Sequence, residues 1–166
     1  ITYAKPVYFV KGQAIETFKV GQPFTMVIGD TGISAPTNES VGDVRKLWEA
    51  DKTKWESVFD KIGAIAKEAR EAVERGKPAL SEVEVMKELG ELMNKNHVLL
   101  QELTVSSPEL ENLISAAHNA GALGAKISGG GRGGNMIALV KPEQAEEVAE
   151  SLMEAGAKRT IITKIS

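Results

Sequence analysis

The stretch AKISGGGRGGNMIALV holds five glycines and one arginine in the six positions from Gly129 to Gly134. Such a run is costly in chain entropy, so it indicates a backbone that must approach something closely. A Walker loop or a dinucleotide fingerprint leads into a helix, whereas residues 135–140 are apolar and strand-like. We interpret the run as a hairpin whose bare amides form an anion-binding concavity. A flexible hairpin that merely joins two strands is the alternative, although one or two glycines suffice for that.

Arg132 is the only charged side chain inside the run. Its planar guanidinium suits phosphate or carboxylate, and a solvated arginine at a hairpin tip is the alternative.

A second short motif, Asp30-Thr31-Gly32, follows an apolar strand as in aspartic proteases. Those enzymes need two such aspartates on a nearly all-β scaffold, so a homodimer would have to supply the second copy. A single copy in a helix-rich chain favours an aspartate that ends a strand and shapes the next turn.

Two further polar residues, Asn96 and His97, lie on or beside an apolar helical stripe. Polar groups there must find partners or face a cleft, and we expect a satisfied core amide and a boundary histidine. His118 has no companion at ligand spacing, so no metal site is expected.

The elements that must position these residues follow from hydrophobic periodicity. Alternation predicts an initial β-meander; its strands cover residues 3–10, 14–20 and 24–28. Helical spacing begins after Pro36 with Thr37 as N-cap, and a second helix ends near Gly76. A third helix opens with a capping box from Ser81 to Glu84, and a fourth begins at Ser107-Pro108.

The C-terminal part reads as strand, tight loop, strand, helix and strand; these segments are 125–128, 129–134, 136–140, 142–155 and 159–165. Together with the strand at 24–28, the order is β-α-β-β-α-β with extra helices in the first crossover. This order predicts an α+β fold, with a ferredoxin-like split βαβ sheet and helices on one face.

Composition limits the function classes. The 166 residues fit one ordinary domain, and the net charge of -3 with 5% aromatic residues favours neither nucleic acid nor membrane as a partner. The chain has no cysteine, which excludes disulfides and thiolate sites. No apolar run is long enough for a bilayer and no signal peptide is evident, so we expect a cytoplasmic protein. The start at Ile1, directly in a strand-like segment, suggests that a preceding segment was removed.

Several segments carry a resemblance to a known family. AKISGGGRGGNMIALV resembles the third, glycine-rich motif of the GHMP kinases, and VIGDTGISAPTNESVGDVRKL is similar to their segment that leaves the sheet for a helix. LGELMNKNHVLLQELTVSSPELENLI resembles a mevalonate kinase helix pair, and ITYAKPVYF the strand after the catalytic aspartate. Together they cover almost the whole chain, which therefore resembles the C-terminal half of a mevalonate kinase.

The resemblance implies transfer of the γ-phosphoryl group of ATP to the 5-hydroxyl of mevalonate, with Mg²⁺, in isoprenoid biosynthesis. In such kinases the protein mainly positions substrates and neutralises charge. It also implies acceptor contacts in the segment from Thr31 to Thr37, with Thr37 as the better candidate for a hydroxyl that faces the substrate. The implied nucleotide-binding residues are Gly129, Gly130, Gly131, Arg132, Gly133 and Gly134.

The chain departs from the family in two ways. Arg132 and Asn135 replace smaller residues of the glycine motif. No Pro-x-x-x-Gly-Leu-Gly-Ser-Ser phosphate loop occurs, the catalytic aspartate would precede Ile1, and Asp30 does not match it. We therefore expect no catalytic residue in this chain, which would be inactive without an N-terminal half of the same enzyme. Residues 1–22 would complete the N-terminal domain and residues 23–166 would form the C-terminal domain.

Two other functions stay open. One is another kinase of the superfamily, either a phosphomevalonate kinase or a mevalonate 3-kinase. The other is a ferredoxin-like ligand-binding module without catalysis, because the fold alone does not define chemistry. A homodimer is also open.

Overall fold

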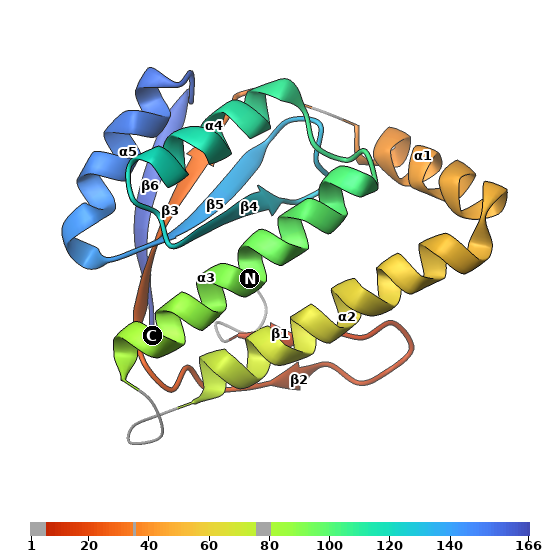
Figure 1. Ribbon diagram of the computed structural model, residues 1–166, viewed down its shortest axis with the longest axis horizontal. Coiled ribbons are helices and arrows are strands. Elements are labelled where there is room, and N and C mark those ends of the chain that lie inside the picture. The colour runs from red at the N-terminus through yellow and green to blue at the C-terminus, as the bar shows by residue number, and fades with distance from the viewer. Residues whose placement is uncertain (1–5, 35, 76–80) are drawn as a thin grey trace.

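The computed structural model describes residues 6–34, 36–75 and 81–166. These residues form a four-stranded antiparallel sheet in the order β4-β5-β3-β6 (Figure 1). The strand bounds are Phe24–Asp30 for β3, Gly124–Ser128 for β4, Asn135–Val140 for β5 and Arg159–Ile165 for β6. Because β5 lies antiparallel between β3 and β4, the latter two are parallel and split, which confirms the ferredoxin-like sheet.

Helices pack against this sheet and extend beyond it (Figure 1). Their bounds are Thr37–Ala50 for α1, Lys52–Glu74 for α2, Glu82–Glu102 for α3, Pro108–Asn119 for α4 and Ala145–Glu154 for α5. A short 3₁₀ helix, η1 (Pro142–Gln144), precedes α5, so the last predicted helix begins with a tighter turn. No helix in the described ranges combines the length and apolar character needed to cross a bilayer.

The predicted helix starts are mostly correct. Ser81 accepts a hydrogen bond from the Glu84 amide while the Glu84 side chain accepts one from the Ser81 amide, which confirms the capping box of α3. Ser107 caps α4. The prediction for α1 is wrong by one residue, because Pro36 occupies the N-cap position and Thr37 is the first helical residue. Proline fixes the backbone where the helix begins but has no side-chain acceptor, so the first turn of α1 has no side-chain cap, although the Glu39 amide donates to the Pro36 carbonyl at 3.1 Å.

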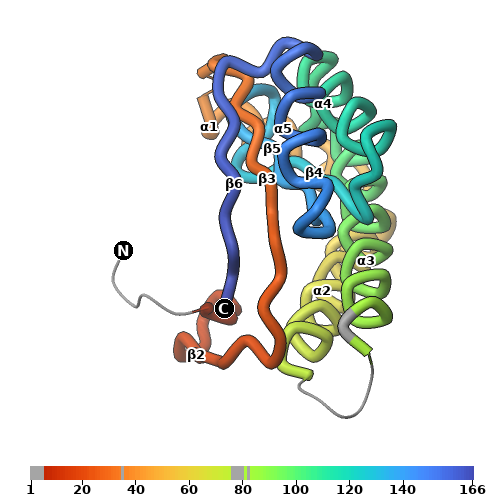
Figure 2. The backbone as a smooth tube through the Cα atoms, turned by 90° about the vertical axis from the view of Figure 1, so that its left-hand side faces the viewer, coloured from red at the N-terminus to blue at the C-terminus, as the bar shows by residue number. Residues whose placement is uncertain are grey.

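Alternate residues of the strands pack into two hydrophobic clusters. Val27, Ala138 and Ala125 are neighbours in register and are buried under α4 and α5. The adjacent pair Met26 and Leu139 packs instead against α3, through Met86, Leu89 and Met93. Figure 2 shows α3, α4 and α5 on the same side of β3 and β6. Successive side chains of a strand point to opposite faces, so α4 and α5 cover one face, whereas α3 also contacts side chains that point the other way. Helix α3 runs along the β4 edge.

The first strands do not extend this sheet. β1 (Val7–Tyr8) pairs with β2 (Glu16–Thr17) in a separate two-stranded sheet, so the predicted continuous meander is wrong. The reason is a competing contact with α2. Arg70 lies over the Tyr8 ring, with 4.9 Å from its guanidinium carbon to the ring centroid, and forms a 2.8 Å ion pair with Glu16. Residues 1–5 of the first predicted strand lie outside the described ranges.

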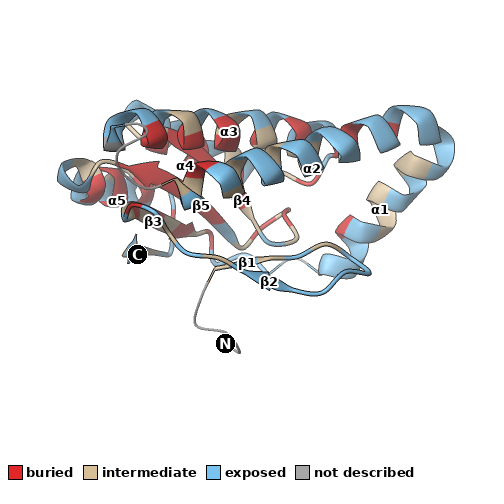
Figure 3. Ribbon diagram, turned by 90° about the horizontal axis from the view of Figure 1, so that it is seen from below, coloured by how far each residue is buried: buried red, intermediate tan, exposed pale blue. Residues whose placement is uncertain are grey.

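Burial follows the same division. Buried residues gather on the strands and on the sides of α3, α4 and α5 that face them, whereas much of α1, α2 and the β1–β2 hairpin is exposed (Figure 3). The hairpin between β4 and β5 lies at the end of the sheet near α1 (Figure 1). The fold therefore brings the glycine run and the start of α1 to one place.

Candidate functional site

The glycine run joins β4 to β5 with a backbone that repeatedly enters the left-handed region. The φ angles of Gly129, Gly131 and Gly134 are +94°, +74° and +74°. Arg132 also has a positive φ of 60°, which a residue with a side chain adopts at a cost of about 1–2 kcal/mol. These angles explain why glycine recurs here.

The segment after β3 holds one side of the run. The amide and the hydroxyl of Thr31 both donate to the Gly134 carbonyl, at 2.9 and 3.0 Å. The Gly134 amide in turn donates to the Ile33 carbonyl at 2.8 Å. Thr31 is buried, so its hydroxyl serves the loop itself.

Two other segments contact the run closely. The Arg132 amide donates to the Val105 carbonyl, in the turn between α3 and α4, at 2.8 Å. A β-carbon added to Gly131 would lie 1.8 Å from that carbonyl oxygen, and one added to Gly130 would lie 3.0 Å from Thr37 Oγ1. The run therefore leaves no room for a β-carbon at Gly131 and only a tight fit at Gly130.

Four backbone amides of the run have no hydrogen-bond acceptor within the described ranges. No residue in the described ranges accepts a hydrogen bond from the amides of Gly129, Gly130, Gly131 and Gly133. Gly131 and Gly133 are buried, and a buried amide without a partner is costly. Successive free amides in a glycine turn form a concavity that suits an anion.

The first turn of α1 adds further donors beside these amides. Its N-cap residue, Pro36, makes no side-chain hydrogen bond, and the first amides of a helix carry positive partial charge. Thr37 is exposed there. Ser40, one turn into the helix, is only 2% exposed, and its hydroxyl has no partner among the described residues. The glycine run and the start of α1 together favour a negatively charged group.

Arg132 is not a free cation at the tip. Its Nη1 forms a 2.6 Å ion pair with Asp43 Oδ2 on α1, and its Nε donates to the Thr104 carbonyl at 3.2 Å. The hydrogen bond from Lys46, followed by that from Arg132, lowers the pKa of Asp43 to about 2. The solvated alternative is therefore wrong, because the guanidinium binds a carboxylate and ties the run to α1.

Other predicted residues lie elsewhere. Asp30 accepts a hydrogen bond from the Gly32 amide at 2.9 Å, which confirms its role in shaping the turn after β3. His97 is 6% exposed rather than a boundary residue, and its Nε2 lies 3.1 Å from Glu111 Oε1. Asn96 is half-buried on α3. His118 is exposed on α4, and no group of three or more metal-binding side chains occurs in the described ranges.

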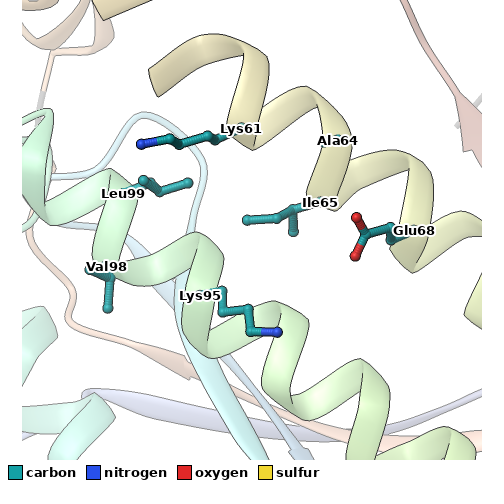
Figure 4. A pocket seen from close by; sticks show the side chains of 7 residues that line it. All are labelled: Lys61, Ala64, Ile65, Glu68, Lys95, Val98 and Leu99. Carbon is teal, nitrogen blue, oxygen red and sulfur yellow. The ribbon is translucent and has the colours of Figure 1, made fainter. Parts of the chain in front are cut away.

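A large hollow lies away from the glycine run. It is an open groove of about 500 Å³ between α2 and α3 (Figure 4). Its walls are mainly aliphatic, with charged groups only at the rim; the lining residues are Lys61, Ala64, Ile65, Glu68, Lys95, Val98 and Leu99. Since no polar groups converge inside it, the groove lacks the features of a reaction site.

A smaller cavity of about 190 Å³ includes a lysine that sequence reasoning missed. Lys126 on β4 borders it together with Asn96 and Met93. Its ammonium group donates to the Ile127 carbonyl at 2.8 Å, and burial lowers its pKa. The available signal was a lysine in an otherwise apolar strand directly before the glycine run.

Comparison with known proteins identifies the fold at family level. The family model for the C-terminal part of GHMP kinases matches residues 69–158, which is more than half of the chain. The chain belongs to the GHMP kinase family. The matched region includes the glycine run, α3, α4 and the strands β4 and β5, so the hairpin described above is part of a GHMP kinase C-terminal domain.

Among GHMP kinases, the chain is most informatively compared with mevalonate kinases. That of Thermococcus sibiricus is 40% identical over 163 residues, covering 96% of this chain and 46% of the relative. That of Pyrococcus abyssi is 41% identical over 141 residues, which cover 85% of this chain and 41% of the relative. The crystal structure of L. major mevalonate kinase in complex with R-mevalonate has a TM-score of 0.84 at 30% identity. The match covers 96% of this chain and 48% of that structure. The chain thus spans about half the length of these relatives.

Proposed function

We propose that the chain forms the C-terminal part of a mevalonate kinase, which transfers the γ-phosphoryl group of ATP to the 5-hydroxyl of mevalonate. One observation carries the proposal: four amides of the glycine run that have no acceptor within the described ranges lie beside the start of α1, which has no side-chain cap, in a chain of a kinase family. Phosphoryl transfer depends on positioning the substrates and on neutralising their negative charge. The amides of the glycine run and the start of α1 can do both.

The glycine run would hold the phosphates through its backbone. The amides of Gly129, Gly130, Gly131 and Gly133 have no acceptor among the described residues, and the missing side chains let phosphate oxygens come within hydrogen-bond distance. Arg132 belongs to this site as the residue that fixes the run. Its amide and guanidinium are both engaged, by Val105 and Asp43, so it keeps the donors aimed at one region.

The two threonines would act differently. Thr37 is exposed and adjoins Gly130, so we assign it the substrate-facing hydroxyl on the acceptor side. Thr31 is occupied by the Gly134 carbonyl and would act on the acceptor only through the shape of the loop.

Mg²⁺ is part of this proposal only as a companion of ATP. The described residues bring no group of three or more metal-binding side chains together, and Mg²⁺ in kinases is bound largely through substrate phosphates. This part of the chain does not fit a metal site of its own, and no step here depends on one. We propose a cytoplasmic location for this activity.

Catalysis would require the polypeptide that makes up the other half of the relatives. Residues 1–22 would pack with that half, and residues 23–166 would form the C-terminal domain. The separation of the β1–β2 sheet from the main sheet supports this division. The partners would be mevalonate and the N-terminal half, with isoprenoid biosynthesis as the purpose.

The test is complementation. The chain alone, the N-terminal half alone and the two together are assayed for ADP release with ATP, Mg²⁺ and mevalonate. We expect turnover only from the mixture or from the full-length protein. Turnover by the chain alone would contradict the division of labour, and a preference for phosphomevalonate, or a 3-phosphate product, would contradict the assigned reaction. Tight effector binding by the chain without turnover in any arm would favour a binding module.

Thr37 provides a sharper test in the full-length protein. Thr37→Ala should raise the KM for mevalonate by about tenfold, as expected for the removal of one hydrogen bond to substrate. Thr37→Ser keeps the hydroxyl and should stay within about twofold of the parent. Equal effects of both variants would remove Thr37 from the acceptor site.

A further inference from the structure

The turn between α3 and α4, residues 103–107, supports the glycine run. The Val105 carbonyl accepts from the Arg132 amide at 2.8 Å, and the Thr104 carbonyl accepts from Arg132 Nε at 3.2 Å. The clearance between Gly131 and Val105 is too small for a β-carbon. A displacement of this turn must therefore displace the run.

The turn needs support of its own. Thr104 has a φ of 57°, in the left-handed region, which costs a side-chain-bearing residue about 1–2 kcal/mol. The amides of Thr104 and Val105 donate back to the end of α3, to the carbonyls of Gln101 at 2.8 Å and Leu100 at 3.3 Å. On the side of the turn that enters α4, Ser107 caps the helix and its carbonyl accepts from the Glu111 amide at 2.9 Å, so these contacts join that side to α4 but not to α3.

Glu111 on α4 secures that side. Its carboxylate accepts hydrogen bonds from Ser106 in the turn and, at 2.7 Å, from Gln101 Nε2 on α3. The buried His97, also on α3, has its Nε2 3.1 Å from the same carboxylate. Burial acts to raise the pKa of Glu111, but the hydrogen bond from Ser106 and the interactions with His97 and Gln101 outweigh it and leave the pKa lowered. One ionised carboxylate thus joins α3, the turn and α4.

We propose that Glu111 is a positioning residue for the phosphate-binding run: it fixes the 103–107 turn, whose carbonyls fix Arg132 and hence the free glycine amides. This rests on the proposed function of the run. Glu111 itself does not touch the run; it acts through Ser106, Val105 and Thr104. Among the described carboxylates, Glu111 alone hydrogen-bonds both a side chain of α3, Gln101, and a side chain of the turn, Ser106.

The test uses full-length kinase with Glu111→Gln, which keeps the size of the side chain and loses the charge. We expect the KM for ATP to rise by about fivefold, the effect of one weakened charge-assisted hydrogen bond, with kcat changed less than about twofold. Ser106→Ala should act similarly, and the double variant should add little to either, because they share one path. The control is Glu102→Gln, an exposed carboxylate at the end of α3 that makes no hydrogen bond within the described ranges, which should match the parent.

Hydrogen exchange separates this proposal from the proposed function. The Arg132 amide, which donates to the Val105 carbonyl, should exchange about tenfold faster in Glu111→Gln than in Glu102→Gln, at unchanged exchange elsewhere in β4 and β5. If exchange responds but the protein binds no nucleotide, the positioning role stands and the kinase assignment fails. If nucleotide binds while neither exchange nor KM distinguishes the two variants, the positioning role is overturned. Should Glu111→Gln not fold, Ser106→Ala decides by the same readouts.

Discussion

Gly131 and Gly134 share a φ of +74° but differ in their surroundings. A β-carbon on Gly131 would lie 1.8 Å from the Val105 carbonyl oxygen, whereas one on Gly134 meets nothing within 4 Å. We expect Gly134→Ala to lower the free energy of unfolding by about 1 kcal/mol, from backbone strain alone. Gly131→Ala should cost about 3 kcal/mol or more, because a backbone clash is added. Chemical denaturation measures both, and equal losses would contradict the packing of the run against Val105.

The ion pairs of Asp43 make the stability of the fold depend on pH in the acidic range. Its pKa of about 2 in the fold lies below the ordinary value of 3.8, so the unfolded chain takes up the proton first. The stabilisation is complete above about pH 4 and is lost as pH falls toward about 2. Asp43→Asn should therefore flatten the decline of stability with pH in that interval, as measured by denaturation at each pH. A parallel decline in both proteins would show that Asp43 is unpaired in solution.

The start of α1 can be altered with a matched pair of substitutions. Pro36→Ser and Pro36→Asp both supply the side-chain acceptor that Pro36 lacks, so each should stabilise the protein by about 1 kcal/mol. Only the aspartate places a negative charge at the proposed phosphate site. We expect it to weaken ATP binding by about fivefold relative to the serine variant, measured by calorimetry on the full-length protein. Equal affinities would place the nucleotide away from the start of α1.

Sequence reasoning worked best where the signal was local. The capping box at Ser81 and Glu84, and the glycine hairpin between two strands, are each contained within a few neighbouring residues. The partner of Arg132 was not predictable, because Asp43 lies 89 positions away and nothing near either residue indicates the pair. The prediction that the first strands continue into the main sheet was wrong for the same reason. Whether β2 extends the main sheet or docks on α2 depends on Arg70, 54 positions from Glu16.

The molecule exposes apolar side chains on the β1–β2 hairpin, which is consistent with the division proposed above. Phe9 is 64% exposed, and Val7 and Ile15 are each 44% exposed. Phe9→Ser should leave the melting temperature of the chain nearly unchanged, because so much of the ring faces solvent. It should weaken association with the N-terminal half by about tenfold, as expected when an aromatic side chain is removed from an interface. Titration calorimetry of the two halves measures this, and Lys11→Ser, an exposed polar position of the same hairpin, is the control.

The anchors of the glycine run also determine when it can form. Thr31 and Gly134 are 103 positions apart, and the Val105 contact adds a second distant segment. Contacts between distant segments bear the entropy of closing long loops, so they follow local pairing during folding. The ladder of β4 and β5 is contiguous and can zip early, yet its tip acquires its final curvature only after β3 and the end of α3 have docked. The concavity is thus a late product of folding, assembled by the finished domain rather than by the hairpin that contains it.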